Sequence, residues 1–254
     1  MNRKPILNMG VNITSLTQAS NKIEQWAKAY QSAYVCVSNV HMCMEVYDNA
    51  AFADVVNAAD KVIPDGKPIA LALKLLGHTE ASQVRGADIT LTLCEMAASK
   101  GLVIGLYGGE ESVLADFSHF LKTKFPDINI GCAISPPFRE LSAQEDADMV
   151  AQINQAKVQI LFVGLGCPKQ ERWMAAHKGQ VNAVMLGVGA VFDFLSGHKK
   201  EAPRWVQSIG MEWFFRLVSE PRRLWKRYFY TNTKFIVLLA IQLFSKRLFF
   251  GNKK

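Results

Sequence analysis

The sequence predicts an α/β fold in which a mainly parallel sheet carries helices on both faces and a basic helical extension follows. Short apolar runs alternate with amphipathic stretches through the first 198 residues, the pattern of repeated strand–helix units. These runs are continuously apolar, as expected of strands that are buried on both faces. Both the pattern and the charge change near Ala202-Pro203.

The strand–helix order predicts a Rossmann-like α/β catalytic domain over residues 1–200 and a helical appendage over residues 201–254. Ser142 is expected to cap the helix that begins at Ala143, with Glu145 in its first turn. The expected strands are Tyr34–Val37, Lys61–Ile63, Leu102–Tyr107, Ile128–Ala133, Gln159–Val163 and Ala183–Val188. The expected helices are Leu16–Tyr30, Met42–Ala58, Ile69–Leu76, Ile89–Lys100, Glu110–Lys124, Ala143–Gln155, Lys169–His177, Arg204–Val218 and Pro221–Phe250.

Positive charge is concentrated in the appendage. The 254 residues carry a formal charge of +7, and Lys199 to Lys254 contain 13 Lys and Arg against three acidic residues. The first 198 residues hold 16 basic and 19 acidic groups. A negatively charged partner is therefore expected to meet the appendage, while the acidic balance of the main domain disfavours nucleic acid as a partner.

The apolar segment Phe235–Phe244 has Gln242 as its one polar residue. It is too short to span a bilayer, which needs about 20 residues. With basic flanks it suits the interface of an anionic membrane, so a peripheral protein is expected. The alternative is a helix packed on the domain or in a homo-oligomer contact.

The cysteines and the N-terminus indicate a cytoplasmic protein. Five scattered cysteines without a Cys-x-x-Cys pair argue against a disulfide framework or a zinc site. The N-terminus has two basic residues, Arg3 and Lys4, but no apolar run, so no signal peptide is expected.

Three glycine-rich turns follow expected strands. Glycine lets a backbone approach a ligand closely, and a helix N-terminus offers N–H groups to phosphate. Together the turns suggest a nucleotide or sugar-nucleotide site beyond the carboxyl ends of the strands. None has G-x-G-x-x-G spacing, and no P-loop occurs, which weakens dehydrogenase and NTPase interpretations. The turns contain Gly108 and Gly109, then Gly164 and Gly166, then Gly189.

Polar side chains also follow the strands. Asp65 comes just after the strand Lys61–Ile63, where a carboxylate suits a general base, although an Asp-Gly turn is the alternative. Asn39 and His41 follow an earlier strand and can orient a sugar hydroxyl. Arg85 suits a phosphate or a carboxylate partner.

Asp88 is expected to cap the helix that follows it. No cluster has metal-ligand spacing, so neither a metal nor a cofactor is expected. A diphosphate would then be neutralised by arginine, lysine and backbone N–H groups. The appendage cations proposed for this task are Arg216, Arg223 and Arg227, which fall on one side of the expected helix, and Lys226, which shares that face.

In combination, these motifs resemble the WecG/TagA/CpsF family of bacterial glycosyltransferases, glycosyltransferase family 26. The resemblance runs in order over about residues 5–228. The most specific pieces are Pro168-Lys169-Gln170-Glu171 and Glu212-Trp213-Phe214-Phe215-Arg216; the others are Asn39, Pro64-Asp65-Gly66, Gly86-Ala87-Asp88, Gly108-Gly109, Gly164-x-Gly166, Gly187-Val188-Gly189 with Asp193 and Gly197, Ala202-Pro203, and Glu220-Pro221-Arg222-Arg223.

The resemblance implies an inverting, metal-independent transferase at the cytoplasmic face of the bacterial inner membrane. It would move a sugar from a UDP-sugar to a polyprenyl-diphosphate-linked sugar in cell-surface polysaccharide synthesis. Asp65 matches the general base, and Asn39 and Gln170 match pocket positions. The family's pattern also implicates Lys169 and Asp193 in substrate binding, with Arg216, Arg223 and Lys226 at the diphosphate of UDP.

The sequence departs from the family's pattern at two places. Val37 stands where the family often has threonine, and Gln83 stands where it often has arginine, with Arg85 as the candidate substitute. Two other function classes stay open from the residues alone. A nicotinamide-dependent oxidoreductase has the glycine-rich α/β pattern as its motivation, and a non-catalytic membrane- or nucleic-acid-binding module has the basic aromatic appendage.

Overall fold

The centre of the molecule is a parallel β-sheet. A computed structural model describes residues 3–250, and within them this sheet has six strands in the order β4-β3-β8-β7-β5-β6. All neighbouring strands run parallel. The predicted fold class is confirmed, as is the position of each expected strand: β3 (Ala33–Ser38), β4 (Lys61–Pro64), β5 (Val103–Tyr107), β6 (Asn129–Ile134), β7 (Ile160–Val163) and β8 (Val184–Gly187).

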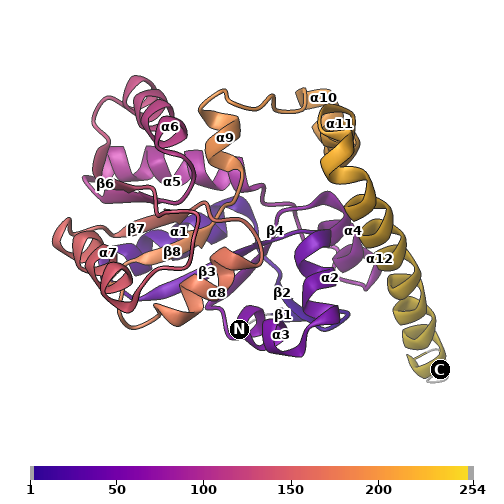
Figure 1. Cartoon of the computed structure of the whole chain (residues 1–254). Coiled ribbons are helices and arrows are strands. Elements are labelled where there is room, and N and C mark those ends of the chain that lie inside the picture. The colour runs from indigo at the N-terminus through magenta and orange to yellow at the C-terminus, as the bar shows by residue number, and fades with distance from the viewer. Residues whose placement is uncertain (1–2, 251–254) are drawn as a thin grey trace.

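Helices cover both faces of the sheet (Figure 1). Successive strand side chains point to opposite faces, so Tyr34 and Cys36 of β3 join one apolar core while Val35 and Val37 join the other. One core contains α1 (Leu16–Lys28), α5 (Gly86–Lys100), α6 (Glu111–Lys124) and α9 (Val191–Leu195). The other contains α2 (Val40–Asp48), α3 (Ala50–Asn57), α4 (Lys67–Leu75), α7 (Ala143–Gln155), α8 (Lys169–Ala176) and part of the C-terminal helix α12 (Pro221–Phe250), which follows α10 (Arg204–Ser208) and α11 (Glu212–Ser219).

After two neighbouring strands, the chain turns to opposite faces of the sheet. Strand β5 leads to α6 on one face, whereas its neighbour β7 leads to α8 on the other. In an open α/β sheet, ligands bind beyond the carboxyl ends of the strands at such a switch point. The strand order differs from the 3-2-1-4-5-6 order of dinucleotide-binding domains.

Two of the expected helices are each divided, so those predictions were wrong. The stretch Met42–Ala58 breaks at Asn49, which ends α2 and accepts a hydrogen bond from the Phe52 N–H at 2.9 Å to start α3. The stretch Arg204–Val218 breaks near Gly210, whose φ of 80° is left-handed. A left-handed residue cannot continue a right-handed helix.

An N-terminal hairpin was not expected from the sequence. Strands β1 (Arg3–Ile6) and β2 (Met9–Asn12) pair antiparallel and form a small sheet of their own. Arg3 and Lys4 in β1, and Gly10 and Asn12 in β2, leave neither strand a continuous apolar run, so both are weak sequence signals. The predicted cap of α7 is confirmed, because Ser142 and Glu145 form a reciprocal capping box.

Helix α12 lies along the side of the α/β unit (Figure 1). Phe235 and Leu239 are buried in its core, and the amide of Gln242 accepts from the Leu7 N–H at 3.0 Å and donates to the Pro5 carbonyl at 3.2 Å. The inner face of the helix is therefore docked, as the packing alternative expected. Within the part of the chain that the structure describes, no helix is long and apolar enough to cross a membrane. The division at residue 200 stays a prediction.

We predict that Gln242→Ala loosens the C-terminal half of α12. Losing both hydrogen bonds leaves the Leu7 N–H without its partner, at a cost of about 1–2 kcal/mol. Amide hydrogen exchange at Leu7 and along α12 measures the change, and faster exchange is expected. The control is Ile241→Ala, since Ile241 is 56% exposed and its loss should leave protection unchanged. Equal exchange in both variants would contradict the docking.

Candidate active site

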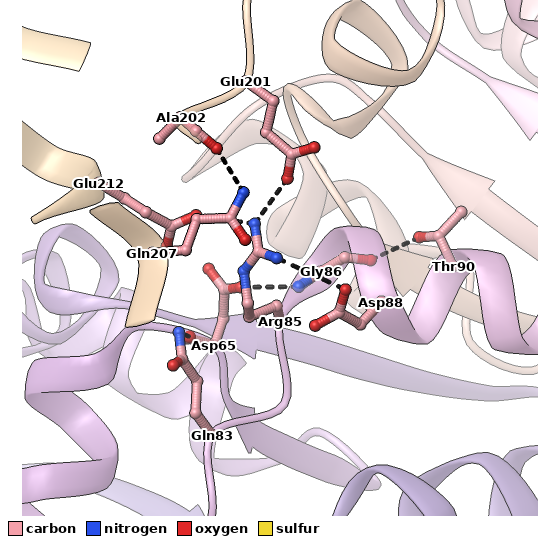
Figure 2. A network of polar contacts seen from close by, with 10 residues as sticks. All are labelled: Asp65, Gln83, Arg85, Gly86, Asp88, Thr90, Glu201, Ala202, Gln207 and Glu212. Atoms are coloured by element: carbon pink, nitrogen blue, oxygen red, sulfur yellow. Dashed lines mark hydrogen bonds and ion pairs between the residues drawn. The ribbon is translucent and has the colours of Figure 1, made fainter. Parts of the chain in front are cut away.

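Asp65 is held where two strands and a helix meet. Its N–H donates to the Ser38 carbonyl at 2.9 Å, which ties the end of β4 to the end of β3. Its carboxylate Oδ1 accepts from the Gly86 N–H at the start of α5, at 2.7 Å. The Gln83 side chain donates to the Asp65 carbonyl at 2.7 Å (Figure 2). The carboxylate is thus fixed in place at the carboxyl end of the sheet.

The surroundings of Asp65 favour a base that works near neutral pH. Burial raises the pKa of Asp65 to about 6, and the charge of Glu212 also raises it. The Gly86 hydrogen bond and the charges of Arg216 and Arg85 lower this pKa and so limit the rise. A general base is most effective when its pKa lies near the working pH. Perturbed carboxylates also cluster at functional sites.

Asn39, the N-cap residue of α2, adjoins the turn that holds Asp65, and His41 lies in the first turn of the same helix. The Asn39 side chain caps the helix by accepting from the Met42 N–H at 3.1 Å. A Cβ on Gly66 would lie 3.4 Å from that of Asn39, so Asn39 adjoins the Asp65 turn. Burial and the charge of Arg227 lower the pKa of His41, against the opposing effects of Glu45 and the Cys167 backbone. His41, on α2, therefore lies near the loop after β7 and near α12.

The glycine turns after β5 and β7 touch each other. A Cβ on Gly108 would meet the Gly164 carbonyl carbon at 2.8 Å, and Gly108 has a φ of 106°. Only glycine fits such a position without strain. Gly109, Gly166 and Gly189 also have positive φ. The turns predicted from sequence thus come together at the switch point of the sheet.

The Gln170 side chain contacts two of the glycine turns. Its side-chain carbonyl accepts from the Gly166 N–H at 3.1 Å, and its amide donates to buried Glu171 at 2.7 Å. A Cβ on Gly187 would meet that amide at 2.8 Å. Gln170 is 3% exposed, so it organises the turns as well as lying among them. Lys169, next to it, is exposed at the start of α8.

The remaining cations and carboxylates proposed from sequence have protein partners. Asp193 pairs with Lys199 at 3.1 Å. The Arg216 guanidinium lies over the Phe194 ring, 4.6 Å from its centroid, and is near enough to lower the pKa of Asp65. Arg223 instead pairs with Glu220 at 2.7 Å, and Lys226 lies over the ring of Trp225.

Arg85 is bound by carboxylates, one of the two partners expected for it. Its Nη2 donates to Glu201 at 2.6 Å and to Glu212 at 2.8 Å, while Nη1 lies 3.5 Å from Asp88 (Figure 2). Arg85, and not Asp88, is the N-cap residue of α5, so the predicted cap was wrong. Asp88 lies instead in the first turn, where its charge suits the helix dipole.

Sequence reasoning missed Gln83, Glu201 and Glu212 as parts of this site. Glu212 stands four residues before Arg216, a spacing that puts both on one helix face, and this was the available signal. Glu201 offered none, because its partner is 116 positions away. The described residues contain no group of three or more His, Cys, Asp or Glu side chains that could hold a metal ion.

Comparison with known proteins bears on what this arrangement does. The model of the glycosyl transferase WecG/TagA/CpsF family matches residues 4–248. The chain belongs to this glycosyltransferase family. The match includes the C-terminal helices through most of α12, so the appendage is part of the family's common structure.

Two Bacillus relatives share about a quarter of their residues with the chain. The Bacillus spizizenii N-acetylglucosaminyldiphosphoundecaprenol N-acetyl-beta-D-mannosaminyltransferase is 27% identical over 229 residues, which cover 89% of this chain and 87% of the relative. The Bacillus subtilis enzyme of the same name is 28% identical over 196 residues, 77% of this chain and 74% of the relative. Membership of the family makes the chain a glycosyltransferase and replaces the oxidoreductase and non-catalytic interpretations.

We predict that Asp65 makes folding stability fall as pH rises. The raised pKa of about 6 means that the folded protein holds this proton more tightly than the unfolded chain does. Stability is then greatest below the unfolded pKa of about 3.9 and is lost as pH rises through about 6. Asp65→Asn should therefore raise Tm, relative to the unsubstituted protein, more at pH 7 than at pH 4 in scanning calorimetry.

Glu145 supplies a control of opposite sign. The Arg139 ion pair and the Ser142 cap hold the pKa of Glu145 at about 2, so its contribution is present at neutral pH and lost in acid. The Tm loss in Glu145→Gln should shrink as pH falls. A Tm difference for Asp65→Asn that stays constant between pH 4 and pH 7 would contradict the raised pKa.

Proposed function

We propose that the protein transfers an N-acetylhexosamine residue from a UDP-sugar to N-acetylglucosamine carried on undecaprenyl diphosphate. The observation that carries this proposal is the partly buried carboxylate of Asp65, fixed at the strand ends in a chain of this glycosyltransferase family. The names of the two Bacillus relatives supply the acceptor and an N-acetylmannosaminyl group as the first candidate for transfer. Such a reaction belongs to synthesis of a cell-envelope polymer.

In the proposed step, Asp65 Oδ2 takes the proton from the acceptor hydroxyl. The hydroxyl oxygen forms a bond to the anomeric carbon, and the bond from that carbon to the β-phosphate oxygen of UDP breaks. The electron pair leaves with UDP. A single in-line displacement inverts the anomeric centre. Oδ1 keeps its bond to the Gly86 N–H, which orients the base throughout.

The leaving diphosphate develops negative charge that the site must stabilise. We propose that the touching glycine turns at Gly108 and Gly164 bring backbone N–H groups to the diphosphate. Among the cations, Arg216 has the largest lowering effect on the pKa of Asp65, and we assign it the transferring phosphate. Gln170 and Asn39 hold the turns and border the sugar site. These groups together replace a metal ion in the proposed mechanism.

Helix α12 is proposed to bring the site to the membrane that carries the acceptor. Its inner face is docked on the α/β unit, whereas Trp225, Phe229 and Ile236 form an outward stripe that is 52%, 74% and 65% exposed. Arg222 and Lys226 adjoin this stripe in the first turns of the helix. Aromatic and aliphatic side chains beside cations suit an anionic lipid interface. The protein would thus work as a peripheral enzyme on the cytoplasmic side.

We predict transfer from at least one UDP-N-acetylhexosamine, with UDP-N-acetylmannosamine first, to N-acetylglucosaminyl-diphosphoundecaprenol or a short-chain analogue. Product formation is measured by mass spectrometry with and without EDTA, and equal rates are expected. Asp65→Asn should lower kcat by about 10²-fold or more, because general-base catalysis contributes about 10²–10⁴-fold, while UDP binding is retained. The control is Asp54→Asn at an exposed carboxylate of α3.

Three results would each contradict part of this proposal. Absence of transfer from every UDP-N-acetylhexosamine would remove the substrate class. Rates abolished by EDTA would remove the metal-free mechanism. Retained turnover in Asp65→Asn would remove the base.

We predict that the double variant Phe229→Ser/Ile236→Ser binds anionic vesicles at least tenfold more weakly than the unsubstituted protein. Full burial of each side chain is worth about 1.5–3 kcal/mol. Sedimentation with phosphatidylglycerol vesicles measures binding, and Tyr30→Ser, at a side chain 45% exposed at the end of α1, is the matched control. Unchanged vesicle binding together with loss of a homo-oligomer would assign this face to a subunit contact instead.

A further inference from the structure

Arg85 holds two carboxylates from the C-terminal segment at once. Its side chain is 18% exposed and donates from Nη2 to Glu201, before α10, and to Glu212, in the first turn of α11. Figure 2 shows the guanidinium between these two carboxylates, with Asp65 close by. One side chain therefore fastens both ends of the segment that crosses from the α/β unit to α11.

The same turn also holds the proposed base. Arg85 is the N-cap residue of α5, and the next residue, Gly86, donates its N–H to Asp65 at 2.7 Å. Backbone and side chain of this one turn thus hold Asp65 and α11 respectively. The relative position of the two depends on a few short hydrogen bonds.

Glu212 and Arg216 are one helical turn apart on α11. Residues at this spacing lie on the same helix face, so the anchor at Glu212 sets where Arg216 points. Arg216 has a second contact, its guanidinium lying 4.6 Å from the centroid of the Phe194 ring in α9. If the ion pair at Glu212 is lost, the Phe194 contact alone must hold Arg216 near Asp65.

We propose that Arg85 is a positioning residue, whose grip on Glu201 and Glu212 fastens α11 over Asp65 and places Arg216 for the transfer step. The proposal rests on the roles proposed above for Asp65 and Arg216. A direct diphosphate contact by Arg85 is disfavoured, because a diphosphate there would lie against the carboxylates of Glu201 and Glu212 and like charges repel.

The ion pairs of Arg85 with Glu201 and Glu212, called the Arg85 clasp below, also affect the pKa of Asp65. Glu212 raises the pKa of Asp65, whereas Arg85 and Arg216 lower it, as does the Gly86 N–H. Neutralising Glu212 should therefore move the acid limb of the pH–rate profile to lower pH. Neutralising Arg85 should move it to higher pH. A residue that only supports the fold would not produce opposite shifts.

The experiment compares Glu212→Gln, Arg85→Gln, Arg85→Glu and the charge-exchanged pair Arg85→Glu/Glu212→Arg in the full-length protein. Each single neutralisation should lower kcat about tenfold or more, since small misplacements of catalytic groups have effects of this size, with opposite shifts of the acid limb. The exchanged pair should recover at least threefold over Arg85→Glu alone. Asp88→Asn is the control, because Asp88 contacts Arg85 without reaching the C-terminal segment, and its kcat should be unchanged.

Docking of the segment from Glu201 to α11 on the α/β unit is measured separately, on the protein without substrate. The assay is trypsin cleavage after Lys200 and Arg204, followed by mass spectrometry. Both neutralised variants should be cut several-fold faster than the unsubstituted protein. Cleavage at the rate of the unsubstituted protein would overturn the proposal that Arg85 fastens this segment. A lower KM for the UDP-sugar in Glu212→Gln with unchanged kcat would also overturn it, since Arg85 would then be a diphosphate ligand. If the unsubstituted protein transfers no sugar, the proposed function fails while the cleavage comparison still tests the clasp.

Discussion

The proposed site depends on a carboxylate that is partly buried and yet keeps its charge at neutral pH. Burial raises the pKa of Asp65 to about 6, and the Gly86 N–H together with Arg216 and Arg85 opposes a larger rise. The carboxylate can occupy this place because β3, β4 and the start of α5 converge there. A base that is mostly ionised near pH 7, yet still basic, is what removal of a hydroxyl proton requires.

The C-terminal helices also influence the pKa of Asp65, although they lie far from it in the sequence. Helix α11 brings one charge of each sign toward the base, with Glu212 raising its pKa and Arg216 lowering it. Helix α12 divides its surface between an inner face buried against α2 and the hairpin and an outer face that remains exposed. This arrangement would suit a transferase with a lipid-linked acceptor, because the helix proposed to meet the lipid also adjoins the helix proposed to complete the site.

Much of the fold was predictable because buried parallel strands impose a strong pattern. Both faces of β3, β7 and β8 are covered, so nearly every position is apolar, with Ser38 at the end of β3 as a polar exception, and these runs stand out in the sequence. Asp65 and the glycine turns were predictable for a related reason, since parallel strands place their carboxyl ends at one edge. The hairpin β1–β2 and the break at Asn49 were not predictable, because Arg3, Lys4 and Asn12 leave the hairpin strands without a continuous apolar run and a single capping side chain leaves little periodic signal.

The partners of Arg85 could not be derived from sequence, as ion pairs across more than a hundred residues follow from tertiary structure. The central claim is that α11 brings Arg216 to a diphosphate at the glycine turns, on the leaving-group side of Asp65. The most direct test is a crystal structure of the full-length protein with UDP bound. The account predicts a distance of about 2.7–3.2 Å between the Arg216 guanidinium and a diphosphate oxygen. A diphosphate bound beyond the reach of Arg216, or held by Arg85 in its place, would contradict it.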